Sequence, residues 1–178
     1  RPRPSAPVSP HRDTPPMMSF YPSEYPPQIV QLIDRPSDGS APTADVRKVL
    51  EVFDFATAVA PIPVADTEMA LACESGLWLR HHFLDRSHDI SQQIHSSTGS
   101  YWHGIMHRRE GDFSNSHYWF NKVGRHPVMS RIGGYDPHEF ITAVETLHTD
   151  DPEGLIAMQR REWEALFSWC VINTRAED

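Results

Sequence analysis

The chain has 178 residues, of which 39% are hydrophobic and 10% aromatic. This is enough apolar material for one substantial core, and the length is too short for two ordinary domains. The formal net charge is -8. General DNA- and RNA-binding proteins usually carry a basic excess that neutralises phosphates, so the charge argues against that class and leaves room only for a local basic site.

The two cysteines, Cys73 and Cys170, lie far apart within apolar segments of helical character. We therefore expect buried thiols rather than a disulfide framework, which favours a reducing, cytoplasmic location. Charged residues interrupt each long apolar run well short of the ~18 residues that a membrane span needs. The N-terminus also lacks the apolar segment of a secretory signal. We expect neither a membrane nor a nucleic acid as partner.

The first 27 residues contain nine of the sixteen prolines. Prolines remove backbone donors, and this segment offers little apolar surface to bury, so the composition predicts a disordered, polyproline-like arm over residues 1–27. The arm is either a passive tail or a ligand for a protein partner of the SH3 type. Residues 28–178 are expected to form a single helical domain.

Apolar residues recur with helical spacing through most of residues 28–178, and no strand-like alternation or internal repeat is present. The pattern predicts an all-α fold, an irregular bundle of about six or seven helices. The sequence predicts one short helical turn over residues 28–33, and helices over residues 46–59, 67–85, 87–94, 101–110, 115–123, 136–147 and 150–170. The segment 67–85 is apolar nearly all round, which is typical of a central, buried helix. Within it, Glu74, His81 and His82 require polar partners.

Side chains that can take part in catalysis or ligand binding are concentrated between Ser100 and Val128. On a helix over residues 101–110, His103 and His107 are four residues apart and Glu110 follows three residues later, so all three project from one side. Two histidines at this spacing are typical of a helix that binds one metal ion, here Zn, Fe or Mn. We expect Glu74, His81 or His82 to supply the remaining metal ligand. Without a metal, His103, His107 and Glu110 are candidates for catalytic proton transfer.

Two known metal patterns fit poorly. A zincin protease requires Glu directly after the first histidine, where this chain has Gly104. A carboxylate-bridged di-iron bundle requires two Glu-x-x-His pairs. The chain has one such pair, Glu145 with His148, and a looser one, Asp85 with His88. A third alternative is that His103 and His107 only form hydrogen bonds in a polar seam between helices.

Five basic and two acidic residues between positions 101 and 131 give this region a net charge of +3, which leaves -11 for the rest of the chain. The basic residues are Arg108, Arg109, Lys122, Arg125 and Arg131. Such an island predicts binding of a small anion, with Arg108, Arg109 and Arg125 holding a carboxylate or phosphate. In the alternative interpretation, Arg108 and Arg109 pair with nearby acids and lock the fold.

Further candidates for ligand contacts follow in the same stretch. Asp112 can cap the next helix, on which Asn115, Tyr118 and Trp119 shape a pocket or, for the aromatic rings, enter the core. The turn Gly124–Pro127 ends that helix and can deliver Arg125 and His126 to a cleft.

The run WHGIMHRREGDFSNSHYWFNKVGRHP resembles a motif in uncharacterised proteins of bacteria and fungi. This resemblance covers about thirty residues. It implies no activity, so no catalytic role follows from it.

The sequence supports two hypotheses about function. In the first, an inter-helical pocket of histidine, arginine and aromatic residues binds a small anionic or polar metabolite, with histidine acid-base or metal-assisted catalysis. In the second, the protein is a non-catalytic scaffold, and the same residues form a structural polar network.

Overall fold

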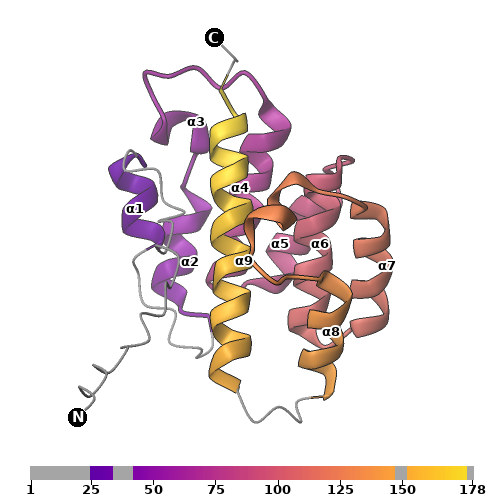
Figure 1. Cartoon of the computed structure of the whole chain (residues 1–178). Coiled ribbons are helices and arrows are strands. Elements are labelled where there is room, and N and C mark those ends of the chain that lie inside the picture. Colours follow the sequence, from indigo (N-terminus) through magenta and orange to yellow (C-terminus); the bar gives the residue numbers. More distant parts are fainter. Residues whose placement is uncertain (1–24, 34–41, 147–151, 176–178) are drawn as a thin grey trace, which may run out of the picture.

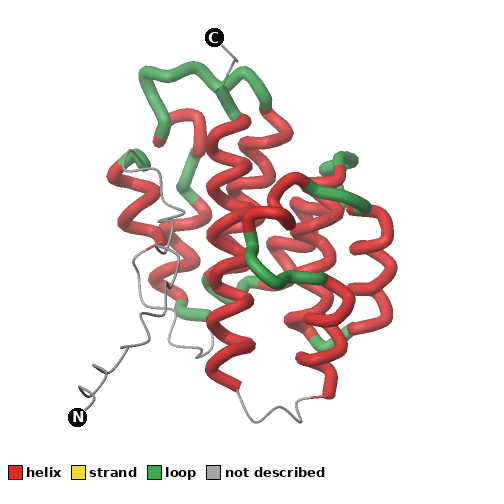
Figure 2. Tube along the Cα trace, in the orientation of Figure 1, coloured by secondary structure: helices red, strands yellow, loops and turns green. Residues whose placement is uncertain are grey.

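The computed structural model describes residues 25–33, 42–146 and 152–175. All regular structure in these residues is helical, as Figure 2 shows, so the all-α prediction is confirmed. The described helices are α1 (Pro27–Ile33), α2 (Ala44–Glu51), α3 (Phe55–Ala58), α4 (Thr67–Arg80), α5 (Leu84–Ser91), α6 (Ser97–Glu110), α7 (Phe113–Val123), the 3₁₀ helix η1 (Pro127–Arg131), α8 (Pro137–Thr146) and α9 (Pro152–Asn173).

The helix predicted over residues 46–59 is two helices, which is one reason the described bundle has more helices than expected. Helix α2 ends at Glu51, and Asp54 caps α3, because its carboxylate accepts a 2.8 Å hydrogen bond from the amide of Thr57. The new direction buries Phe55 and Ala58. The sequence predicts helix over most of this range, but not the break at residues 52–54 or the capping role of Asp54.

The proline-rich arm predicted for residues 1–27 lies mostly outside the described residues. Its last part, however, belongs to the folded unit. Tyr25 is buried, its hydroxyl lies 2.7 Å from the Ser168 hydroxyl, and its ring meets Phe167 edge to face. Pro27 opens α1, so the domain begins no later than Tyr25 rather than at residue 28.

Helices α4 and α9 form the centre of the bundle, with α1 to α3 on one side and α5 to α8 on the other (Figure 1). The indole N–H of Trp163 in α9 donates a 2.8 Å hydrogen bond to the backbone carbonyl of Gly76 in α4. Cys73 and Cys170 are buried as free thiols on these two helices, as the sequence predicts. Helix α4 is the central helix that the sequence predicts, but it ends at Arg80 rather than at residue 85, and α5 already begins at Leu84.

Helices α6 and α7 pack closely because Gly104 has no side chain. A Cβ atom at this position would lie 2.8 Å from the ring of Phe120. The Ser116 hydroxyl donates a 2.7 Å hydrogen bond to the Gly104 carbonyl across the same contact. Gly111, in the left-handed conformation at φ 87°, ends α6, and the chain turns directly into α7. Gly104 therefore sets the distance between α6 and α7.

A buried ion pair joins α6 to α9. Both guanidinium N–H₂ groups of Arg108 donate to the two carboxylate oxygens of Glu162, and both side chains are fully buried. The Tyr135 hydroxyl also donates to Glu162, and the Arg108 guanidinium lies 4.3 Å from the centre of the Phe140 ring. Three helices and the loop before α8 thus meet at one charged contact.

Within the described residues, no helix combines the length and the apolar character needed to cross a bilayer.

Replacing one member of this ion pair should be strongly destabilising, because the other charge would stay buried without a partner. We expect Glu162→Ala to lower the free energy of unfolding by about 3–5 kcal/mol, whereas the apolar double variant Arg108→Met/Glu162→Leu should recover most of that loss. Urea unfolding measures both values. Glu145→Ala, on an exposed position of α8, is the control, and a Glu162→Ala variant as stable as this control would contradict the prediction.

Candidate functional site

Three histidines meet between α5 and α6. They are His88 on α5 and His103 and His107 on α6, and one possible ligand atom of each lies within 4.8 Å of those of the other two. The ring centres of His88 and His103 are 4.5 Å apart, and those of His103 and His107 are 4.8 Å apart. His103 and His107 are buried and His88 is half-buried. We call these three residues the histidine cluster.

Hydrogen bonds position two rings of the cluster. Nδ1 of His103 lies 3.2 Å from the Ser91 hydroxyl, which is also 3.2 Å from the backbone carbonyl of His88. Nδ1 of His107 lies 2.6 Å from a carboxylate oxygen of Glu110, which is an acceptor. His107 therefore carries a proton on Nδ1, and in its neutral form Nε2 keeps a lone pair that can bind a metal ion.

The surroundings hold His103 uncharged. Burial first, and then the neighbouring His88, His107 and Lys122, lower the pKa of His103 to about 3. His103 is therefore neutral at physiological pH, which is the form that binds metal ions. The half-buried Trp119 lies against His103, with ring centres 3.9 Å apart and planes inclined by 31°, and forms a wall of the cluster.

Asp112 lies close to His107 and Glu110 and could form a second ligand group with them. Its two carboxylate oxygens, however, accept hydrogen bonds from the backbone and side-chain amides of Asn115 at 3.1 and 2.7 Å. These bonds lower the pKa of Asp112. Asp112 thus caps α7, and Asn115 serves that cap at an exposed position.

The structure does not bring Glu74, His81 or His82 to the histidine cluster. The His81 ring is bonded to the backbone carbonyl of Leu32 in α1 at 2.9 Å. Burial raises the pKa of Glu74, which lies beside Phe55 and Asp54 at α3. His82 faces Arg109. The expected ligands from α4 are wrong because Glu74 and His81 face α1 and α3, and His88 of α5 takes the place that we had assigned to them.

Arg108 and Arg109 are bound inside the fold rather than presented to a ligand. Arg108 is paired with Glu162, as described above. Arg109 donates to the backbone carbonyl of Leu79 at the end of α4 and lies 2.7 Å from Nδ1 of His82. Burial, together with Arg108 and Arg80, lowers the pKa of Arg109 to about 10, so it stays charged at neutral pH. The alternative in which both arginines pair with acids describes Arg108, whereas Arg109 is held by a backbone carbonyl and a histidine.

The remaining predicted residues are spread around α7. Tyr118 is 52% exposed and Arg125 is exposed beyond the helix end. His126 is buried and begins η1, where its Nδ1 accepts the amide N–H of Val128 and its Nε2 lies 3.1 Å from the Thr98 hydroxyl. Because Nδ1 accepts, the proton of a neutral His126 is on Nε2 and points to Thr98. His126 therefore has a structural role.

Three residues next to the site were not predicted as parts of it, namely His88, Ser91 and Lys122. His88 and Ser91 are three residues apart, so they share one side of α5. That spacing can be recognised in the sequence. The sequence does not show, however, that α5 is the helix that faces the His103 side of α6. Lys122 lies 4.4 Å from the centre of the Trp119 ring.

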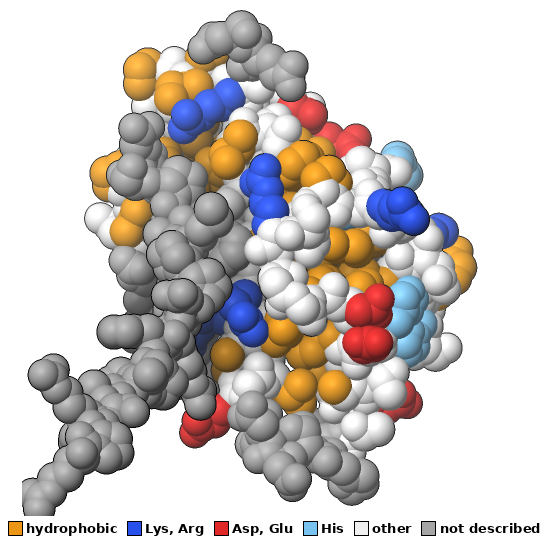
Figure 3. Space-filling model, viewed as in Figure 1, with side chains coloured by type: hydrophobic (Ala, Val, Ile, Leu, Met, Phe, Trp, Pro, Cys, Tyr) orange, Lys and Arg blue, Asp and Glu red, His pale blue; other side chains and the backbone are white. Residues whose placement is uncertain are grey.

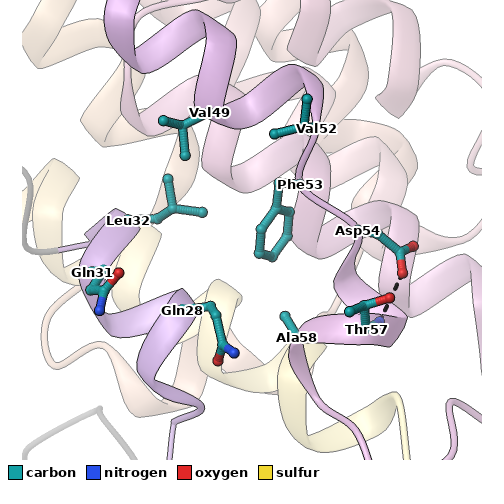
Figure 4. A pocket seen from close by; sticks show the side chains of 9 residues that line it. All are labelled: Gln28, Gln31, Leu32, Val49, Val52, Phe53, Asp54, Thr57 and Ala58. Carbon is teal, nitrogen blue, oxygen red and sulfur yellow. Dashed lines mark hydrogen bonds between the residues drawn. The ribbon is translucent and has the colours of Figure 1, made fainter.

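Other surface features are distant from this chemistry. A pocket of about 350 Å³ lies between α1, α2 and α3, and Figure 4 shows its mainly apolar lining with Leu32 and Phe53. The hydrogen bond drawn there, from Thr57 to Asp54, is the α3 cap. On the face in Figure 3, Lys and Arg side chains are spread among apolar and acidic ones rather than gathered. This face offers no broad basic surface.

No family model, curated protein or solved structure matches the chain. The arrangement of its own side chains is therefore the basis for a functional argument.

The buried, neutral His126 should make stability depend on pH. Burial lowers its pKa to about 4, against about 6.5 in an unfolded chain. Between these values the unfolded chain binds a proton that the folded chain does not, so this contribution is complete above pH 6.5 and is lost as the pH falls to 4. We expect the wild type to lose up to about 3 kcal/mol more than His126→Gln over this window.

Urea unfolding at several pH values between 4 and 7 measures this difference. His95→Gln, at an exposed position, should keep the wild-type profile. Parallel profiles for the wild type and His126→Gln would show that His126 is not held neutral.

Proposed function

We propose that the protein binds one divalent transition metal ion, zinc in the first place, at the histidine cluster and uses it to act on a small polar or anionic metabolite. The observation that carries the proposal is the convergence of His88, His103 and His107, with possible ligand atoms mutually within 4.8 Å. The hydrogen bond between His107 and Glu110 supports it, because a carboxylate on Nδ1 leaves Nε2 of a neutral His107 unprotonated.

The ligand set favours zinc among the metals considered. Imidazole nitrogen suits zinc, whereas manganese prefers oxygen ligands, and mononuclear iron enzymes commonly combine two histidines with one carboxylate. Three protein ligands and one open position are the pattern of catalytic rather than structural zinc sites. In such a site the ion supplies Lewis acidity, which lowers the pKa of a bound water toward neutrality and polarises a substrate oxygen.

The residues around the cluster have separate tasks in this proposal. Glu110 orients His107 and raises its basicity as a ligand, and Ser91 does the same for His103 with a neutral hydroxyl. Trp119 covers one side of His103 and keeps water from it. The two buried free thiols are compatible with the cytoplasmic location expected from the sequence.

A non-catalytic scaffold is the second candidate. The observation that favours it is that Arg108, Arg109 and His126 all have partners within the fold. In that case the histidine cluster would be a polar seam without a metal ion, so metal content separates the two proposals.

Purified protein exchanged into zinc should contain one ion per chain, and His88→Ala and His107→Ala should each lose it. The reason is that two imidazoles hold zinc far more weakly than three. Elemental analysis after gel filtration gives the stoichiometry, and circular dichroism verifies that each variant is folded. His95→Ala, an exposed histidine outside the cluster, should retain the ion. Metal-replete wild type without stoichiometric zinc would refute the proposed site.

The carboxylate of Glu110 should matter through His107 rather than as a ligand. We expect Glu110→Gln to weaken zinc binding by about 10- to 100-fold, the usual effect of losing a carboxylate behind a histidine ligand. Competition with a chromogenic chelator measures the affinity. Glu145→Gln is the matched exposed control, and equal affinities of the two variants would remove Glu110 from the site.

A further inference from the structure

Lys122 stands beside the histidine cluster on α7. Its ammonium nitrogen lies 4.4 Å from the centre of the Trp119 ring and 4.9 Å from that of Tyr118. Trp119 in turn lies against His103, with ring centres 3.9 Å apart. One indole therefore contacts both a ring of the cluster and a cationic group. Burial of His103 is the main cause of its lowered pKa, but the charge of Lys122 also contributes, which agrees with this proximity.

The position of Lys122 differs from that of the other cations in the basic stretch. Arg108 and Arg109 point into the bundle, where Glu162 and the end of α4 hold them. The Arg131 guanidinium lies 5.6 Å from the centre of the Trp169 ring. Arg125 and Arg131 are exposed, as Lys122 is, but Lys122 lies against Trp119, the ring that contacts His103.

The aromatic neighbours restrict the Lys122 side chain. An exposed lysine normally loses much conformational freedom when it binds a ligand. The faces of Tyr118 and Trp119, inclined by 81° to each other, attract the ammonium group to one region beside the cluster. The Lys122 side chain therefore already lacks part of its conformational freedom in the free protein, and the smaller entropy loss on binding favours a ligand.

The charges at the site favour an anion. Three neutral imidazoles leave the two positive charges of a divalent ion uncompensated, and Lys122 adds a third. Glu110, hydrogen-bonded to His107, supplies one negative charge. A metal-loaded cluster would therefore be cationic in a chain whose formal net charge is -8. A local positive field of this kind attracts small anions.

We infer that the open position at the histidine cluster takes one oxygen of a small oxyanion, a carboxylate or phosphate group, and that Lys122 binds a second oxygen of the same group. The inference rests on the proposed metal site and names the substrate class for it. Lys122 is the specificity-determining residue in this arrangement, since it distinguishes a charged oxyanion from a neutral carbonyl compound.

The test uses the full chain loaded with Co²⁺ in place of zinc, because the visible absorption of this ion reports its ligands. Acetate and inorganic phosphate are titrated separately into the wild type, Lys122→Met and Lys122→Arg. Lys48→Met, at the other lysine of the chain, is the matched control. Circular dichroism verifies folding, which an exposed substitution should leave intact.

The expected result is a saturable change in the Co²⁺ spectrum with at least one anion, about tenfold weaker in Lys122→Met, as for loss of one charge-assisted hydrogen bond. Lys122→Arg should retain most of the affinity, and Lys48→Met all of it. If Co²⁺ binds but neither anion changes the spectrum, or Lys122→Met binds as the wild type does, the role of Lys122 is refuted and the metal site stands. If Co²⁺ does not bind, both proposals fail.

Discussion

The buried pair of Arg108 and Glu162 is the constraint on which the positions of the other residues depend. A guanidinium and a carboxylate that share two hydrogen bonds fix not only the distance between α6 and α9 but also the rotation of α6 about its axis. Desolvation of both charges is unfavourable, and the additional donation from Tyr135 offsets part of it. With Arg108 directed at α9, the side of α6 that bears His103 and His107 is turned toward α5.

Helix α7 adds an aromatic wall and a cation to the side of α6 that bears the histidines. Because Gly104 permits close approach, the Trp119 side chain of α7 reaches His103, and Lys122 follows three residues later on the same side. The histidine cluster is thus built from a helix held by the core ion pair, a preceding helix that supplies His88, and a following helix that supplies an aromatic wall. In the proposed metal site the three imidazoles would be the ligands, and the charged groups Glu110 and Lys122 would lie outside the ligand set.

Much of the fold could be predicted from the sequence, because apolar spacing, caps and prolines are local signals. The common side of His103, His107 and Glu110 was predictable for the same reason. The residues of other helices that pack against that side were not predictable. Helix α4 is apolar nearly all round, so its sequence does not tell which way Glu74 and His81 face, and they face α1 and α3. Adjacent residues on a helix point about 100° apart, so Arg108 and Arg109 meet different helices. Composition alone could not show that these two arginines point into the fold whereas Lys122 lies on its surface.

The three histidines lie within a short piece of chain, whereas Arg108 and Glu162 are 54 residues apart. Local contacts require little loop closure and form early in folding, while distant ones form late. Loop closure therefore costs less for the contact between α5 and α6 than for the contact of α6 with α9. The histidines of the cluster are neighbours in sequence, whereas the ion pair that holds α6 in place joins distant parts of the chain.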